Sequence, residues 1–326
     1  MRPLSGMLFS ITIALFATTS VGAMTSKGHL FVGLVAPGSD AHVGVERYAL
    51  VDGLPQGQGE LYIPPPYGGL IAASAGGTLY VQAPSVGRFA EIAAFRYGER
   101  KPSRKVDIPL ELGCYSGSIY PITAISTDRN GLLYVLLNTF FSDDFTRGRV
   151  HVRAPTWYLC EGVAIFGPGA QGHDPPRWTL PFFAYYLGGM ASDDEANLYL
   201  DDGLPQSIVE FATVFAKPKV TRRLPGTGPY GEKIACDAAG NLYVLHNTSV
   251  AVYLPEARPA NGSARLRNAF NLATGTYDAI VATERYVYVE DFSTSTLSIY
   301  DAHAVGNPLP VDSLTLPDAG FLTIGP

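Results

Sequence analysis

A unit of short apolar runs joined by tight turns recurs along this chain, and it limits the fold more than any other feature of the sequence. Its clearest copy is residues 235–255, ACDAAGNLYVLHNTSVAVYLP. Asp237 can accept hydrogen bonds from backbone amides two residues on, and Gly240 and Asn241 tolerate positive φ angles, so this stretch is typical of a turn. The flanking runs are rich in β-branched and aromatic side chains, as strands are. The unit therefore predicts strand, turn, strand, loop, strand.

Five other segments carry this unit in whole or in part. They are residues 30–32, 71–81, 124–135, 190–200 and 280–289. A third run follows each second strand, at residues 43–48, 92–97, 163–166, 208–211, 250–253 and 297–300. A fourth follows each third, at residues 61–63, 106–108, 178–180, 222–224, 269–272 and 313–316. Four strands per unit, repeating about every forty to fifty residues, are typical of a β-propeller. We expect an all-β fold of six blades, each a four-stranded antiparallel sheet.

The two ends of the chain predict how the ring closes. The first unit lacks a first strand at its N-terminal side, and residues 317–324 read as a first strand with nothing after it. We therefore expect the C-terminal strand to be the inner strand of blade one. Such closure pairs one end of the chain with the other and leaves no open sheet edge at the seam.

The N-terminus has the features of a signal peptide, which we place at residues 1–23. Arg2 is the only early charge, residues 7–17 form a short apolar core, and Val21-Gly22-Ala23 fits a cleavage site. A membrane anchor is the alternative, but the run is short for a bilayer. We predict a secreted or periplasmic protein without a membrane span, whose residues 24–326 form one propeller domain.

Charge and cysteine content narrow the function further. Arg2 is one of 23 basic residues, so the mature chain has 22 of them against 29 acidic ones and a net charge of −7. This excess of acid argues against nucleic acid as a partner. Cys114 and Cys160 belong to one predicted blade, and an oxidising compartment would permit a disulfide between them. Cys236 lies on a predicted inner strand, where we expect a buried thiol with a packing role.

Blade three carries an insertion. Residues 138–161 separate its second and third strands, and residues 170–176 form a further loop rich in Gly and Pro. We expect a lengthened hairpin. Insertions of this kind lie in loops and often on the binding face, although an ornament without function is the equal alternative.

The repeat resembles that of the NHL-type and virginiamycin B lyase-like six-bladed propellers of secreted bacterial proteins. Tyr230-Gly231 and residues 237–244, DAAGNLYV, carry the resemblance together with their copies, which cover nearly the whole mature chain. The resemblance implies the fold. It leaves the activity open, because such propellers include binding scaffolds as well as enzymes.

In a propeller, the loops between blades and those from second to third strands share one face. On that face the sequence places tyrosines interleaved with acids, amides and a histidine: Tyr67, Tyr120, Tyr186, Tyr230, Tyr277, Asn138, Asp201, Asp202, His246, Asn247, Glu290 and Asp291. Tyrosine rings suit sugars and peptide side chains, and the oxygen ligands suit Ca²⁺ or Mg²⁺. The alternative is that the tyrosines pack between blades and that the acids are solvated loop residues.

Motifs for catalysis are absent from the sequence: there is no His-Glu-x-x-His, Cys-x-x-Cys, P-loop or Gly-x-Ser-x-Gly. We therefore assign no catalytic residue and interpret the chain as a non-catalytic binding or scaffold protein, a monomer whose loop face takes a protein, peptide or glycan. The alternative is a metal-dependent lyase or lactonase with its site at the channel mouth. A virginiamycin B lyase-like activity would need a His and a Glu near Mg²⁺, for which His246 and Glu290 are the candidates. The cofactor is unknown, and Ca²⁺ or Mg²⁺ enters only under this alternative.

Overall fold

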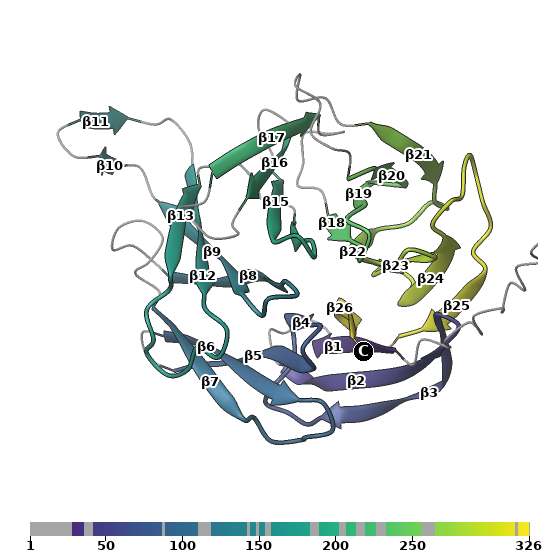
Figure 1. Ribbon diagram of the computed structural model, residues 1–326, viewed down its shortest axis with the longest axis horizontal. Coiled ribbons are helices and arrows are strands. Elements are labelled where there is room, and N and C mark those ends of the chain that lie inside the picture. The colour runs from purple at the N-terminus through teal and green to yellow at the C-terminus, as the bar shows by residue number, and fades with distance from the viewer. Residues whose placement is uncertain are drawn as a thin grey trace, which may run out of the picture.

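The computed structural model describes residues 28–35, 42–86, 89–109, 119–141, 144–147, 150–153, 158–182, 189–201, 207–212, 219–225, 233–255, 265–316 and 319–325. Within these ranges the chain forms strands and no helix, and the strands make a ring of blades around a central channel (Figure 1). None of the described residues belongs to a helix long and apolar enough to cross a membrane. The signal peptide predicted at residues 1–23 lies outside these ranges, and so does Cys114.

The ring has six blades, each a four-stranded antiparallel sheet, as the repeat predicts. From the channel outwards, blade one is β26 (Ala319–Gly325), β1 (His29–Val35), β2 (His42–Val51) and β3 (Leu54–Ile63). Blade two is β4 (Ile71–Ala73), β5 (Thr78–Val86), β6 (Phe89–Arg96) and β7 (Arg104–Pro109), and blade three is β8 (Ile119–Thr127), β9 (Leu133–Phe141), β12 (Tyr158–Phe166) and β13 (Trp178–Phe182). Blade four is β14 (Met190–Ser192), β15 (Asn197–Asp201), β16 (Ser207–Ala212) and β17 (Lys219–Pro225). Blade five is β18 (Lys233–Cys236), β19 (Leu242–His246), β20 (Ser249–Tyr253) and β21 (Leu266–Asn271), and blade six is β22 (Tyr277–Ala282), β23 (Tyr286–Asp291), β24 (Thr296–Asp301) and β25 (Asp312–Thr315).

The last strand of the chain completes the first blade, which confirms the predicted closure. β26 pairs antiparallel with β1, from His29 opposite Gly325 to Leu34 opposite Ala319. In Figure 1 the yellow C-terminal strand lies against the purple N-terminal strand at the channel. Gly325 is required there, because a Cβ at this position would collide with the Tyr97 hydroxyl of blade two.

A buried aspartate fixes the turn of each well-formed repeat. In blade five, Asp237 accepts hydrogen bonds from the Asn241 amide nitrogen (2.9 Å), the Asn241 side chain (2.7 Å) and the Tyr243 hydroxyl (2.9 Å). Equivalent bonds join Asp193 to Asn197 and Tyr199, and Asp128 to Leu132 and Tyr134. In each of these repeats the aspartate therefore binds the residues four and six positions after it in one hydrogen-bonded unit. These carboxylates have a structural role.

The hydrophobic core lies between the blades, so the centre of the ring is left for the channel. Each pair of neighbouring blades shares a cluster of buried side chains, for example Val135 of blade three with Ile92 of blade two. Cys236 packs against the cluster between blades four and five, which confirms the packing role predicted for it, but its side chain is half-buried and not fully buried as expected. Cys160 lies in β12, but the disulfide to Cys114 stays a prediction because Cys114 is not among the described residues.

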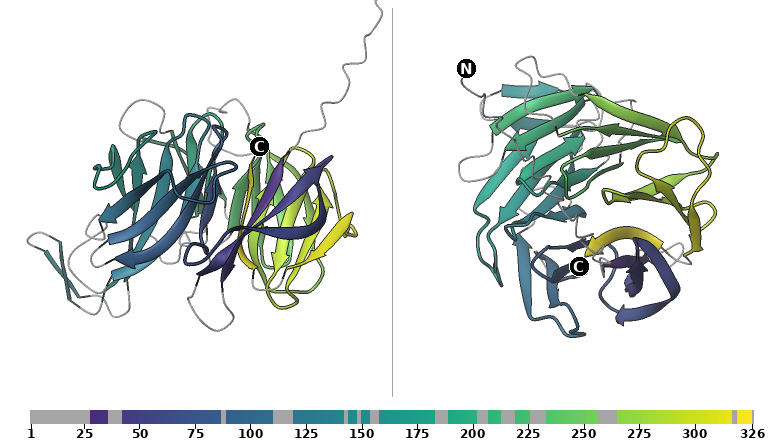
Figure 2. Two further views of the ribbon diagram at one scale, coloured as in Figure 1. Left: turned by 90° about the horizontal axis from the view of Figure 1, so that it is seen from below. Right: turned by 45° about the vertical axis from the view of Figure 1, so that its right-hand side comes forward.

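Blade three extends beyond the ring, as its insertion predicts. Strands β9 and β12 stay paired out to Phe141 opposite Tyr158. Beyond them, β10 (Asp144–Arg147) and β11 (Val150–Arg153) form a separate hairpin that projects away from the blades (Figures 1 and 2).

The Gly/Pro-rich loop of blade three turns back to the ring and covers an outer edge. Gly172 forms a parallel bridge with Val106 of β7, and it accepts a hydrogen bond from the Asp107 amide nitrogen (2.8 Å). Gly306 of blade six bridges Phe270 of β21 in the same way. The outermost strands of blades two and five therefore each gain a partner from the next blade, which shields an edge that could pair with another chain.

Candidate functional site

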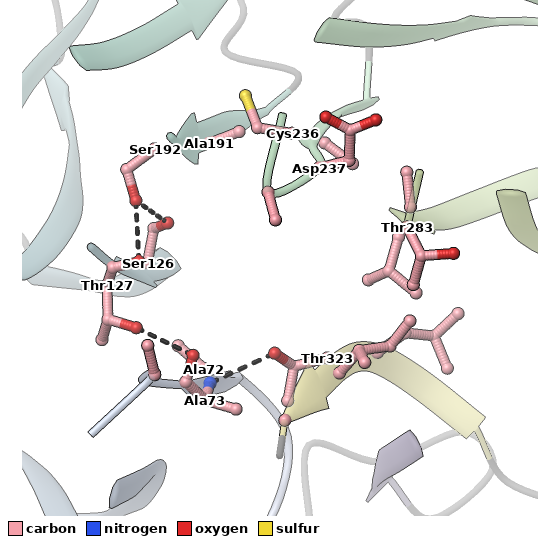
Figure 3. A pocket seen from close by; sticks show the side chains of 18 of the residues that line it. Ala72, Ala73, Ser126, Thr127, Ala191, Ser192, Cys236, Asp237, Thr283 and Thr323 are labelled. Carbon is pink, nitrogen blue, oxygen red and sulfur yellow. Dashed lines mark hydrogen bonds between the residues drawn. The ribbon is translucent and has the colours of Figure 1, made fainter. Parts of the chain in front are cut away.

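The channel contains a cavity of about 770 Å³ at one end of the ring. Its walls are the six inner strands and, in blades two to six, residues of the turns from first to second strand. At blade one, Gly28 and the turn between β2 and β3 contribute instead. Figure 3 shows part of this lining. We call this end of the ring the turn face. We call the opposite end, which carries the connections between blades and the loops from second to third strands, the loop face.

Hydroxyl groups link the inner strands of four neighbouring blades along the cavity wall. The Ala73 amide nitrogen donates to Thr323 Oγ1 (3.1 Å), and Thr127 Oγ1 donates to the Ala73 carbonyl (3.0 Å). Ser192 Oγ donates to the Thr127 carbonyl (3.0 Å) and lies 2.7 Å from Ser126 Oγ (Figure 3). Each inner strand is the edge of its sheet, so its channel-side backbone groups need partners. Side-chain hydroxyls supply them here, and they add polar groups to a wall that otherwise carries apolar side chains such as Ile125, Met190 and Ile234.

Small side chains keep the channel open between these hydroxyls. Ala72, Ala73, Ala191, Ala235 and Ala282 all contribute to the lining, from blades two, four, five and six. Methyl groups fill little of the space between six converging strands. The cavity is therefore large enough for a small molecule, since pockets for such ligands run from about 300 to 1,000 Å³.

Charged residues surround the cavity where the turns open to solvent. Asp194 is half-buried, and burial raises its pKa above the ordinary value. The Arg129 guanidinium opposes this rise. The neighbouring carboxylates add to the rise, and they belong to Asp193, Asp128 and Asp237. Arg285 leans towards blade one, where it donates to the Asp52 carbonyl (3.5 Å). Its guanidinium also lies over the Tyr286 ring, 5.0 Å from the centroid.

Of the tyrosines predicted as ligand-binding residues, two can be placed in full, and both lie on the loop face. Tyr67 is half-buried and packs edge-on against Phe95, with 5.2 Å between ring centroids. Tyr277 donates a hydrogen bond from its hydroxyl to the Ala273 carbonyl (2.8 Å), and burial raises its pKa to about 12. Of the others, Tyr120 is the second residue of β8, whereas Tyr186 and Tyr230 lie outside the described residues.

The predicted polar residues of the loop face divide into buried and exposed groups. Asp201 is buried at the end of β15, and Asn247 is exposed in the turn after β19 with a φ of 46°. His246 Nε2 lies 2.9 Å from the Asn247 side-chain nitrogen. Asn138 lies in β9, and Asp202 is outside the described residues.

Asp291 shapes the turn between β23 and β24. Its carboxylate accepts hydrogen bonds from the backbone of Thr276 and Ser293 and from the hydroxyls of Ser293 and Thr294. Burial alone would raise its pKa, but these donors outweigh burial and hold the pKa below its usual value. Such a well-satisfied carboxylate serves the loop conformation.

Glu290 is the most unusual of the predicted residues. Its side chain is 1% exposed, and Oε2 has no hydrogen-bond partner among the described residues. Burial raises its pKa to about 7, with further contributions from the carboxylates of Asp278 and Asp291. A carboxyl group in this state can hold or release a proton near neutral pH. Within the described part of the chain, no three His, Cys, Asp or Glu side chains are arranged to hold a metal ion.

The hydroxyls of the turn face were missed by reasoning from the sequence. A signal for them exists in the aligned repeats, because Thr127 and Ser192 occupy the position just before the turn aspartate. Cys236 has the same position in blade five and Ala73 precedes the turn serine of blade two. A small residue at this position is compatible with packing, so only the structure distinguishes a channel wall from core.

Comparisons with known proteins support the architecture and leave the family open. No family model matches the sequence, and no curated protein matches it. A protein from Lactobacillus plantarum is 13% identical, with 91% of this chain and 99% of that chain covered and a TM-score of 0.56. A chain of the nidogen/laminin complex is 13% identical, with 91% of this chain and 98% of that chain covered and a TM-score of 0.56. The periplasmic gluconolactonase PpgL of Pseudomonas aeruginosa is 16% identical, with 92% of this chain and 99% of that chain covered and a TM-score of 0.54.

These similarities show the fold alone. Proteins that share a propeller can differ in function, so the site must carry the functional argument.

Proposed function

We propose that this protein is a non-catalytic binding propeller, exported from the cytoplasm, which holds a small polar molecule in the channel cavity of the turn face. The cavity of about 770 Å³ with its hydroxyl-bearing wall is the observation that carries this proposal. A ligand there would be enclosed by all six blades and could form hydrogen bonds on several sides. The apolar N-terminal segment supports export.

The bonding of the wall supports binding over chemistry. A serine or threonine hydroxyl becomes a nucleophile when a base accepts its proton. Thr127 and Ser192 instead donate to backbone carbonyls. The carboxylate of Asp237, which also lines the cavity, accepts hydrogen bonds from Asn241 and Tyr243. These groups are committed to structure, and what remains for a ligand is hydrogen bonding.

A test of this proposal needs to block the cavity without disturbing the core. Ala238 and Ala239 are neighbours in one exposed turn, but only Ala238 lines the cavity. We expect Ala238→Trp to abolish binding of polar small molecules in calorimetric titration, and Ala239→Trp to leave it intact. Mass spectrometry of small molecules released from the purified protein supplies the first candidates. Equal binding by both variants would contradict a site in the channel.

The loop face remains a second binding surface in this proposal. Its predicted tyrosines, acids and amides would meet a protein, peptide or glycan. The nidogen/laminin complex contains a chain of similar fold, which supports a protein partner by analogy of fold.

One observation favours the enzyme alternative. Glu290 combines deep burial, an oxygen without a partner among the described residues and a pKa of about 7, which suits a general acid or base. A metal-dependent lyase or lactonase at the loop face would use it. We would measure lactone hydrolysis with Mg²⁺ and Ca²⁺, comparing Glu290→Gln with Glu284→Gln, an exposed acid of the same blade on the other face. Hydrolysis lost only in Glu290→Gln would favour the enzyme.

A further inference from the structure

We propose that the ligand of the channel cavity is a small organic cation that also carries hydroxyl groups, such as an aminated polyol or amino sugar. This inference rests on the proposed binding function and adds the chemical class of the ligand. Two independent features carry it, the charge of the lining and the direction of the hydrogen bonds in the wall.

The lining of the cavity is negative. Five acids contribute to it against two arginines, so its formal charge is −3; the seven residues are Asp52, Asp128, Asp194, Asp237, Glu284, Arg129 and Arg285. The hydrogen bonds that Asp128 and Asp237 accept come from neutral groups, namely backbone amides, asparagine side chains and tyrosine hydroxyls. Hydrogen bonds from neutral donors stabilise a carboxylate without cancelling its charge, so its field still reaches the cavity.

The positive charges of the lining do not cancel this field in the cavity. Arg285 is drawn to blade one by the Asp52 carbonyl and by the ring of Tyr286. Arg129 acts on Asp194 and lowers its pKa, yet burial and three neighbouring carboxylates raise that pKa overall. The thiol of Cys236 responds to the same field: burial raises its pKa, and Asp193 and Asp237 raise it further. Groups at this end of the channel therefore lie in a negative potential, which favours a cation and disfavours an anion.

The wall presents acceptors to the ligand. A hydroxyl has one proton to donate and two lone pairs to accept with. Thr127 gives its proton to the Ala73 carbonyl, and Ser192 gives its proton to the Thr127 carbonyl. With the Ser192 proton on that carbonyl, Ser126 must donate in the bond of 2.7 Å between the two serines. These three protons are used within the wall, so Ser126, Thr127 and Ser192 keep lone pairs for a ligand rich in N–H and O–H donors. Thr323 Oγ1 accepts from the Ala73 amide nitrogen and keeps its own proton, which suits a hydroxyl oxygen of the same ligand.

Three sugars of nearly equal size and different charge test the inference: glucosamine, glucose and glucuronate. At about pH 6 the amine of glucosamine is protonated. We expect glucosamine to bind about tenfold tighter than glucose, the change that one added charge pair of moderate separation brings at a protein surface. Glucuronate should bind more weakly than glucose. Calorimetric titration at low and high salt gives both the order and its electrostatic part, since salt should reduce the preference.

Two neighbouring acids provide a matched pair of variants. Asp194 is half-buried and lines the cavity, whereas Glu195 is exposed and does not. Asp194→Asn should lower the preference for glucosamine over glucose several-fold, and Glu195→Gln should leave it unchanged. Equal binding of glucosamine and glucose, with both lost in Ala238→Trp, would overturn the cation inference while the channel site survives. Failure of all three sugars, with no small molecule released from the purified protein, would overturn both.

Discussion

Replacing Glu290 with glutamine should stabilise the protein at neutral and alkaline pH. Tyr286 and Tyr288 belong to the buried cluster between blades six and one. Side chains of a strand alternate, so Glu290 lies on the same face of β23 and its charge would be buried at that junction. Burial, together with the carboxylates of Asp278 and Asp291, raises its pKa from 4.5 to about 7. At about 1.4 kcal/mol for each pKa unit, the ionised form costs the fold roughly 3 kcal/mol.

The sign of the pH dependence follows from proton binding. Between pH 4.5 and about 7 the folded protein keeps the Glu290 proton while the unfolded chain has lost it. The free energy of unfolding therefore falls as pH rises through this window, and the cost is fully present above it. Below the window Glu290 is neutral in both states and contributes no charge penalty. A glutamine stays neutral at every pH, so the difference between the two proteins should grow with pH.

Denaturant unfolding of both proteins at about pH 4 and about pH 8 measures this difference. We expect nearly equal stability at the lower pH and a gain of up to roughly 3 kcal/mol for Glu290→Gln at the higher one. Groups other than Glu290 titrate in both proteins and cancel in the comparison. Glu284→Gln, which changes an exposed acid of the same blade, should show no such growth. A gap that is constant with pH, or larger at low pH, would refute the reasoning.

Two further predictions concern the ring itself. Deletion of residues 319–326 removes β26, so we expect a marked fall in melting temperature and a tendency to aggregate; an unchanged melting curve would contradict strand closure. Tyr243→Phe removes the hydroxyl 2.9 Å from the buried Asp237 carboxylate and should cost about 1 to 3 kcal/mol in denaturant unfolding, with no loss if the aspartate holds the turn alone.

The fold could be predicted from the sequence because its information is local. The spacing of Asp237 to Tyr243 lies within one turn and one strand, and the alternation of apolar residues around it marks each blade. The sequence also predicts that the last strand completes blade one, since the first unit lacks a strand that residues 317–324 supply. Local patterns are sufficient for a repeat architecture whose units resemble one another.

The candidate site was less predictable because it depends on contacts between blades. The sequence indicates the loop-face residues only by their chemical type. Chemical type does not reveal that the ring of Tyr67 packs on Phe95, or that the Asp291 carboxylate is hydrogen-bonded within its own turn. The hydroxyls of the channel are hard to recognise because the groups that they join lie far apart in the sequence. Ser126 and Ser192 are 66 positions apart, and Ala73 and Thr323 are 250 positions apart. Their role follows from the ring and not from any motif.

The pairing of the first and last strands also sets the timing of folding during synthesis. His29 can pair with Gly325 only after every residue between them has been synthesised. Until then β1 can pair with β2 but has no partner on its channel side. A chain that stops before β26 would leave that edge of β1 exposed, and an unpaired strand edge invites pairing with other chains. The ring can therefore close only in a chain that contains both β1 and β26.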